Sequence, residues 1–404
     1  MLAVPIRQAI AGCVLLAASA FADTGPKPSS WAEGVVPCGD LEGVTVEMSA
    51  EEVDLVLRKG DAREGGDQLV VKATFHMINH GDQVAFEHGF PVGPTRNMTG
   101  FSATFDGSNV EAKLVDLEGG AGVEMPEGKS EEDEREGKVH RYWYTWNQSY
   151  RREQKADLVV AYTLGVWHFS EVRNAAYLLR TGAGWKNTIG KAVITLRCEG
   201  GLTLDHLLRL APVDGAAHHG DHITWTFEDF EPGSNHDIQF WYNRSETRAS
   251  TIEKTRKDAK RNWDSRLLLV DQLEDVHHLR CRKTRTAAEL KDYLDALASK
   301  IDGIKETEGR FVLPLPGMYM KEKDGAHFLL NSIDLAIIAV RDYPQAPQAR
   351  EVLERYMKVV RAFIDGNLYF GGTKLEYSEG IRKGQINELN DRLKAAQDVL
   401  GKSK

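Results

Sequence analysis

The sequence predicts a mainly β, sandwich-like N-terminal region followed by an α-helical C-terminal domain. Two observations carry this prediction. Apolar residues recur at every second position from about 43 to 117 and again from 142 to 242, which is the period of strands with one buried face. After Asn243 the composition changes to Lys, Arg, Glu, Asp and Ala with helical spacing. Strands that follow one another without helices favour an antiparallel sandwich over βαβ units.

The first 22 residues have the form of a signal peptide. Arg7 supplies the positive start, Ala9 to Ala18 form a short apolar stretch, and Ala20-Phe21-Ala22 presents the small-x-small pattern of a cleavage site. No later segment reaches the ~18 consecutive apolar residues of a membrane helix. A lipid anchor at Cys13 is the alternative, disfavoured because apolar residues continue beyond that cysteine. We therefore expect a periplasmic or secreted bacterial protein without a transmembrane segment after cleavage.

The sandwich region is expected to span residues 37 to 245 in two sheet blocks. In the first block, Thr99 to Leu114 form a predicted hairpin around the turn Asp106-Gly107-Ser108-Asn109. Three strands are predicted before it, at Val44 to Met48, Val53 to Leu57 and Leu69 to Met77.

A loop separates the two blocks. Residues 119 to 138 combine five glycines with the acidic run Glu131 to Glu134, and such a stretch cannot bury apolar surface. The second block then contains six predicted strands, at Tyr142 to Trp146, Leu158 to Leu164, Tyr177 to Leu179, Ala192 to Leu196, Ile223 to Phe227 and Ile238 to Tyr242.

The C-terminal part divides into a charged helical connector, residues 246 to 283, and a helical domain, residues 284 to 404. Ser250-Thr251-Ile252-Glu253 and Thr286-Ala287-Ala288-Glu289 both match a capping box and predict helix starts. Amphipathic patterns predict further helices at Phe328 to Val340, Pro347 to Ile364 and Ile381 to Leu400.

Three cysteines remain after cleavage, namely Cys38, Cys198 and Cys281. In an oxidising compartment one disulfide would leave one thiol over. We expect a Cys38–Cys198 disulfide because both residues flank predicted strands of the same region. A Cys198–Cys281 disulfide and no disulfide at all are the alternatives.

The segment Tyr177 to Trp185 resembles exported bacterial domains of unknown function, the family numbered 4424. Ile189-Gly190 and the strand Ala192 to Leu196 follow it in the same manner. The other similar stretches are Val46-Glu47-Met48, Phe90-Pro91, Ile223-Thr224-Trp225 and Phe230-Glu231-Pro232. The resemblance covers about residues 40 to 245, leaves the helical third unmatched and includes no catalytic residue. It implies a β-sandwich and an envelope setting rather than a reaction.

The same segment contains glycines that fit a turn with positive φ between two strands. Trp185 at its end can fold back into the core, or it can serve a ligand.

Trp143 and Tyr144, together with Trp185, are the candidate ligand-binding residues. The run from Tyr142 to Trp146 places aromatic rings on both faces of one strand. Planar rings can stack on the faces of sugars, and Trp143 would do so if it faces solvent. Packing in the sandwich core is the alternative interpretation.

Three histidines are the candidate metal ligands. His218, His219 and His222 crowd around Asp221, and imidazoles beside a carboxylate suit zinc, copper or nickel. The alternative is the polar tip of a hairpin. We predict no other cofactor.

Charge and missing motifs limit the function classes. The net charge is −9 and becomes more negative without Arg7, which argues against a nucleic-acid partner. The sequence contains no Gly-x-Ser-x-Gly or His-Glu-x-x-His motif, and we predict no catalytic residue.

The first functional hypothesis is a non-catalytic envelope binding or interaction protein whose partner is an envelope protein or an extracellular polymer. The alternative is a periplasmic or secreted hydrolase of envelope glycan or peptide, with a site between the sandwich and the helical domain. His168, Glu171, His277 and His278 are its titratable candidates. A purely structural role as a spacer or oligomerisation element is a third hypothesis.

Overall fold

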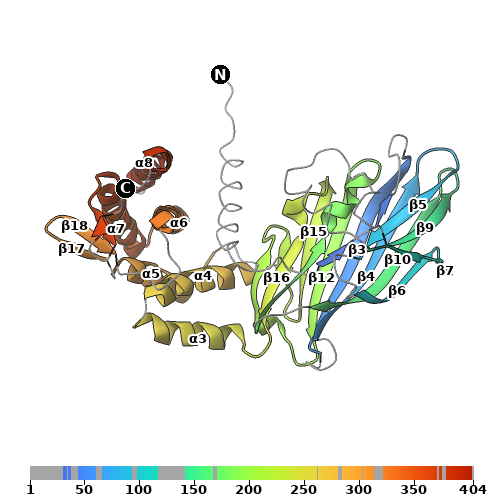
Figure 1. The fold of residues 1–404 in the computed structure, drawn as a ribbon, viewed down its shortest axis with the longest axis horizontal. Coiled ribbons are helices and arrows are strands. Elements are labelled where there is room, and N and C mark those ends of the chain that lie inside the picture. The colour runs from blue at the N-terminus through green and yellow to red at the C-terminus, as the bar shows by residue number, and fades with distance from the viewer. Residues whose placement is uncertain are drawn as a thin grey trace, which may run out of the picture. The chain divides into compact units, whose positions relative to one another are not determined.

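The chain forms two compact units, each with a core of its own (Figure 1). The computed structural model describes residues 31–33, 35–37, 44–60, 66–92, 98–116, 142–166, 171–261, 263–280, 284–302, 304–313, 322–370, 373–374 and 379–402. The β unit holds the described residues up to Ser250 together with Asp275–Cys281, and the helical unit holds Thr251–Glu274 and the residues after Cys281.

The described residues of the β unit form three sheets. The largest has eight strands in the order β14-β15-β12-β3-β4-β10-β6-β7. Their bounds are β3 Val46–Arg58, β4 Asp67–Asn79, β6 Met98–Phe105, β7 Ser108–Asn109, β10 Lys155–Val166, β12 Ile189–Glu199, β14 Ala216–His218 and β15 His222–Phe230.

Two four-stranded sheets complete the β unit. One has the order β1-β11-β16-β13, with β1 Trp31–Glu33, β11 Val172–Leu178, β16 Ile238–Asn243 and β13 Leu207–Ala211. The other has the order β2-β5-β9-β8, with β2 Val36–Pro37, β5 Val84–Pro91, β9 Tyr142–Tyr150 and β8 Lys113–Asp116. Leu55 of the large sheet, Phe90 of β5 and Phe240 of β16 belong to one continuous core.

The sheets are mixed rather than wholly antiparallel. Strand β12 runs parallel to β3, and β1 runs parallel to β11, whereas the sequence pattern predicted antiparallel pairing throughout. Alternation reveals which residues of a strand are buried, but it carries no information about the direction of the neighbouring strand.

A β-bulge joins two predicted strands into one. The register of β3 against β4 shifts between Met48 and Ala50, and the Ser49 hydroxyl donates to the His76 carbonyl at 2.9 Å. The extra residue moves the buried positions from even to odd numbers, because a bulge changes the phase of the alternation. The apolar alternation in the sequence therefore breaks at the bulge, although strand β3 continues through it.

The predicted hairpin is present only in its first part. Asp106 and Gly107 have φ values of 48° and 76°, as a two-residue turn requires, and they join β6 to the short strand β7. The chain then leaves this sheet, and Lys113–Asp116 pairs with β9 of another sheet. The predicted loop 119–138 lies outside the described residues.

The C-terminal region is helical, as predicted, and also holds a small sheet. The helices are α3 Arg248–Ala259, α4 Trp263–Leu279, α5 Ala287–Asp302, α6 Glu322–Asp342, α7 Pro347–Ile364 and α8 Glu379–Lys402. The sheet, not predicted, has the order β17-β18-β19-β20, with β17 Lys305–Thr307, β18 Arg310–Leu313, β19 Leu368–Phe370 and β20 Thr373–Lys374. Within the described residues, no helix is long and apolar enough to cross a membrane.

One of the two capping boxes forms. The Glu289 amide donates to the Thr286 hydroxyl at 3.3 Å, and the Thr286 amide donates to the Glu289 carboxylate at 2.7 Å. The box at Ser250 was wrong, because α3 begins at Arg248 and the Ser250 amide donates to the hydroxyl of Thr247.

Candidate binding groove

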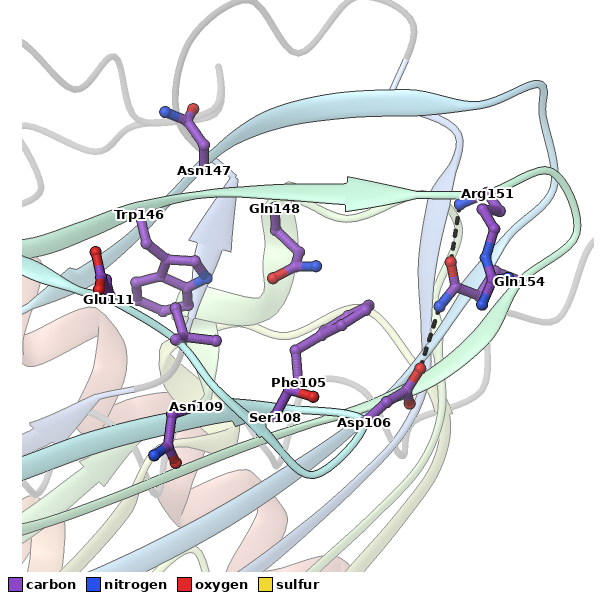
Figure 2. A pocket seen from close by; sticks show the side chains of 11 residues that line it. Phe105, Asp106, Ser108, Asn109, Glu111, Trp146, Asn147, Gln148, Arg151 and Gln154 are labelled. Atoms are coloured by element: carbon purple, nitrogen blue, oxygen red, sulfur yellow. Dashed lines mark hydrogen bonds between the residues drawn. The ribbon is translucent and has the colours of Figure 1, made fainter.

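A groove of about 470 Å³ lies where the β6–β7 hairpin and strand β9 meet (Figure 2). The hairpin and the residues after it contribute Phe105 to Glu111 except Gly107, strand β9 contributes Trp146 to Gln148, and the turn into β10 contributes Arg151 and Gln154. The volume falls within the range of small-ligand sites. The groove is therefore large enough to hold part of a ligand.

The crossing of the chain between two sheets creates this groove. The Val110 amide still donates to the Ala103 carbonyl of β6 at 2.9 Å, but Lys113 already pairs with Thr145 of β9. Strand β7 is only two residues long and ends the eight-stranded sheet. The eight-stranded sheet thus ends at the short strand β7, and side chains of this sheet and of the sheet that contains β9 are left to line the groove.

Trp146 is the most buried aromatic residue of the groove. Its side chain is 4 % exposed, and its indole Nε1 is buried without a hydrogen-bond partner among the described residues. Figure 2 shows the ring on the side of the groove that faces Phe105 and Gln148. A buried N–H group without an acceptor is costly, and an acceptor supplied by a ligand would relieve that cost.

A buried histidine supports Trp146 from the protein interior. The rings of His88 and Trp146 stack at a centroid distance of 5.4 Å, and His88 Nε2 lies 2.9 Å from the Tyr150 hydroxyl. Burial lowers the pKa of His88 to about 3, so its imidazole is neutral at physiological pH. The stack fixes the position of the indole without placing a charge beneath it.

The polar wall of the groove is fixed by hydrogen bonds. The Gln154 side-chain amide donates to an Asp106 carboxylate oxygen at 3.1 Å, and the Arg151 backbone amide donates to the side-chain Oε1 of Gln154 at 2.8 Å (Figure 2). The Asp157 amide donates to the other Asp106 oxygen at 3.1 Å. This wall is therefore ordered before a ligand arrives.

The three predicted aromatic residues do not line the groove. Trp143 is 3 % exposed and points to the opposite face of β9 from Trp146, away from the groove. Tyr144 is half-buried and stacks on Phe101 at 3.9 Å. Trp185 is 5 % exposed, and its Nε1 donates to the Val35 carbonyl at 3.1 Å.

The signal for Trp146 was present in the aromatic run. Residues 142, 144, 146, 148 and 150 share one face of β9. Trp146 thus belongs to the even-numbered face, whereas the predicted ligand-binding residue Trp143 belongs to the odd-numbered face.

The histidine cluster forms the tip of the β14–β15 hairpin. The rings of His219 and His222 stack at 4.9 Å, His219 Nε2 lies 2.9 Å from the Thr224 hydroxyl, and His222 Nδ1 lies 2.6 Å from Asp221. The Gly220 amide donates to His218 Nδ1 at 3.1 Å. Within the described residues, no group of three or more His, Cys, Asp or Glu side chains is placed to hold a metal ion.

Cys198 of β12 has no disulfide partner among the described residues, and burial raises the pKa of its thiol to about 12. Cys38 and Cys281 lie outside the described residues, so the Cys38–Cys198 disulfide stays a prediction.

Two buried polar clusters connect the sheets away from the groove. The Tyr177 hydroxyl donates to Glu51 at 2.6 Å, and burial raises the pKa of Glu51 to about 7. Asp67 is fully buried, with Arg173 Nη1 2.5 Å and Arg244 Nε 3.0 Å from its carboxylate oxygens. Both clusters join the large sheet to the β11–β16 sheet.

The titratable residues of the hydrolase hypothesis occupy separate settings. His168 lies outside the described residues, and the Glu171 carboxylate accepts a hydrogen bond from Ser245. His277 and His278 are neighbours on α4, with ring centroids 6.1 Å apart.

Comparisons with known proteins identify no family. No protein-family model matches the chain, and no curated protein matches it. The assignment to family 4424 was therefore wrong. The segment behind it forms the end of β11 and a 3-10 turn over Leu179–Gly184, and Gly182 has no positive φ. A Cβ on Gly182 would instead come within 3.0 Å of Ile189, so close packing explains that glycine.

Solved structures show only distant likeness. A Legionella pneumophila protein provisionally described as a nutrient binding protein has 12 % identity and a TM-score of 0.40, over 90 % of this chain and 97 % of that one. An M1 zinc metallopeptidase variant from Deinococcus radiodurans has 10 % identity and a TM-score of 0.27, over 49 % and 42 %. An M1 zinc metallopeptidase structure from the same organism has 8 % identity and a TM-score of 0.24, over 88 % and 94 %. At these scores the likenesses carry no functional argument.

Proposed function

We propose that this chain is an exported, non-catalytic binding or interaction protein. Its three sheets serve as a β-sandwich scaffold, and it contacts an envelope partner or extracellular polymer through the groove between the β6–β7 hairpin and β9. The single observation that supports this most is Trp146, which lines the groove and whose buried indole N–H has no acceptor among the described residues.

The chemistry of the groove favours binding over catalysis. Its two carboxylates, on Asp106 and Glu111, belong to exposed residues, and Asp106 is already committed to Gln154 and the Asp157 amide. The lining residues include no His or Cys. A general acid and base would need carboxylates in an apolar setting or an imidazole within reach of the ligand.

The proposed setting is the periplasm or the extracellular space. The pattern Ala20-Phe21-Ala22 supports cleavage there, so that the mature chain starts at Asp23. Mass spectrometry of the protein from fractionated bacteria should find this N-terminus outside the cytoplasm. An uncleaved, cytoplasmic chain would contradict the export proposal.

Photocrosslinking tests the groove as the contact site. A photoreactive phenylalanine derivative replaces Ser108, which pairs with Phe105 and shares its face, in the full-length chain, which is expressed in its native cells and irradiated. We expect a discrete adduct that weakens when Trp146→Phe is added and persists with Trp241→Phe, a half-buried indole on β16 outside the groove. The matched control places the same derivative at Asn235, an exposed residue of another turn. Equal adducts at both positions, or an adduct insensitive to Trp146→Phe, would contradict the proposal.

A further inference from the structure

We infer that Glu51 and Tyr177 form a proton-dependent joint between the large sheet and the β1-β11-β16-β13 sheet. The joint holds while the Glu51 carboxyl carries its proton, and it loosens at one end of β11 when that carboxyl ionises. Two buried carboxyl groups connect these sheets, and the contrast between their surroundings supports this device. The joint lies inside the β unit, so it depends neither on the groove nor on the proposed function.

The first carboxyl group, that of Asp67, is compensated by cations. Arg173 Nη1 lies 2.5 Å from one of its oxygens, and Arg244 Nε lies 3.0 Å from the other. The Tyr242 hydroxyl also donates to it at 3.0 Å. Guanidinium groups stay charged in proteins, so Asp67 can remain ionised although it is fully buried. Arg173 is the second residue of β11, and this cluster therefore fixes the beginning of that strand at any ordinary pH.

The second carboxyl group, that of Glu51, has apolar neighbours within the large sheet. The residue is 2 % exposed, and the strand register places Phe75 of β4 and Ala192 of β12 directly beside it. The next positions on the same face of the sheet are also apolar, namely Val53, Ala73, Met77 and Ile194. From the facing sheet, the Tyr177 hydroxyl donates to the carboxyl at 2.6 Å. A neutral phenol thus stands where two guanidinium groups meet Asp67.

The charged residues close to Tyr177 do not supply a cation to Glu51. Arg180 lies in the turn that follows β11, and its Nε is 3.0 Å from a carboxylate oxygen of Asp237. Glu33 of β1 pairs with Leu178, one position beyond Tyr177, and a second acidic residue does not favour ionisation of Glu51. Burial accordingly raises the pKa of Glu51 to about 7, opposed by the hydrogen bond from Tyr177.

Ionisation of Glu51 leaves a negative charge in an apolar interior. One hydrogen bond from a neutral hydroxyl group replaces only part of the hydration that a carboxylate has in water. Full hydration is regained when the end of β11 moves away from β3 and admits water. The protonated carboxyl has much less hydration to regain, so it favours the closed joint. The ionised carboxyl favours the open one.

The position of Tyr177 determines which segments can open. Tyr177 is the last residue but one of β11, and the 3-10 turn Leu179–Gly184 follows it. Strand β1 pairs in parallel with this same end, along Ala176 to Leu178. The beginning of β11 stays attached through Arg173 and Asp67. We therefore expect the end of β11, the turn and β1 to loosen while the beginning of β11 remains in place.

Hydrogen exchange of the mature chain, residues 23 to 404, tests the joint at pH 5.0 and 7.5. Mass spectrometry follows each segment, and the rates are corrected for the intrinsic dependence of amide exchange on pH. The Glu51 carboxyl has a pKa of about 7 in the closed joint and an ordinary value of 4.5 when hydrated. The opening equilibrium constant of residues 176 to 184 should therefore rise about 50-fold between these two pH values. Residues 238 to 243 of β16 should change less than about threefold.

Two variants connect this rise to Glu51. Glu51→Gln keeps an acceptor for the Tyr177 hydroxyl but cannot ionise, so the rise should disappear. Its matched control is Glu52→Gln, in which an adjacent side chain with 71 % exposure is neutralised and the rise should remain. Tyr177→Phe removes the hydroxyl that favours the ionised form, so the rise should continue to a higher pH than in the parent. Circular dichroism checks the folding of each variant.

Three results would overturn the joint. They are a corrected exchange of residues 176 to 184 that is equal at both pH values, an equal rise in β16, and an undiminished rise in Glu51→Gln. If Glu51→Gln does not fold, Tyr177→Phe decides, and an unchanged pH dependence in that variant would reject the joint.

Discussion

Glu51 and His88 are buried titratable residues of the β unit. Burial shifts the pKa of each side chain so that its neutral form is favoured. Burial raises the pKa of Glu51 from 4.5 to about 7 and lowers that of His88 from 6.5 to about 3. Their exposed fractions are 2 % and 0 %. Each residue therefore couples the stability of the β unit to pH, and the two couplings have opposite signs.

The pH windows of the two residues overlap. The unfolded chain ionises Glu51 above about pH 4.5 while the folded chain keeps its proton to about pH 7, so stability falls as the pH rises through this window. The unfolded chain protonates His88 below pH 6.5 while the folded chain excludes the proton to about pH 3, so stability rises with pH through that window. Between about pH 4.5 and 6.5 the two contributions offset each other.

Replacing Glu51 should expose the contribution of His88. In Glu51→Gln, the free energy of unfolding should rise with pH from 4.5 to 6.5, and its difference from the parent should grow by about 3 kcal/mol up to pH 7. Urea unfolding followed by tryptophan fluorescence at pH 4.5, 5.5, 6.5 and 7.5 measures this difference. The control is Glu52→Gln, because the adjacent Glu52 side chain is 71 % exposed. Parallel pH curves for Glu51→Gln and the parent would show that Glu51 does not titrate as stated.

At the residue scale, the sequence could predict the aromatic strand but not which of its rings lines the groove. The parity of β9 separates Trp143 from Trp146, yet both are nearly buried, at 3 % and 4 %. What distinguishes them is the short strand β7, which leaves the groove open beside Trp146. That is a property of two sheets together, and no local pattern contains it.

At the scale of elements, the sequence predicted strands well where the alternation kept its phase. Helix α7 begins at Pro347 and ends at Ile364 as predicted, because a proline in the first turn and a left-handed Gly366 mark both ends. The small sheet β17–β20 was missed because its strands have two to four residues, too few for a period to show.

The capping box at Thr286 should matter more than the similar pattern at Ser250. Thr286→Ala removes the acceptor of the Glu289 amide and should lower the free energy of unfolding of the helical unit by about 1 kcal/mol. Ser250→Ala is the matched control, because Ser250 lies inside α3 and Thr247 accepts its amide hydrogen bond, so we expect a change of at most a few tenths of 1 kcal/mol. Urea unfolding followed by circular dichroism at 222 nm measures both. Equal losses in the two variants would contradict the assignment of the helix start.

At the scale of the whole molecule, composition predicted a sheet-rich region followed by helices, and the structure confirms that order. It could not predict that Asp275–Cys281 of the helical part belongs to the β unit. Leu279, near the end of α4, is 2 % exposed and lies in the core shared by the three sheets, and Arg209 of β13 lies 3.7 Å from Asp275. The amphipathic pattern of α4 shows which residues are apolar but not which core receives them.

The β unit should therefore depend on a residue far beyond its last strand. Leu279→Ala removes a side chain from a closed core and should lower the free energy of unfolding of the β unit by about 2–5 kcal/mol. Tryptophan fluorescence reports this unit through the buried residues Trp143, Trp146, Trp185 and Trp225. The control is Leu268→Ala on the same helix, where the residue is 46 % exposed and a change within about 0.5 kcal/mol is expected. If the fluorescence midpoint in urea were the same for Leu279→Ala and Leu268→Ala, the core of the β unit would end with its strands, and α4 would be only a connector.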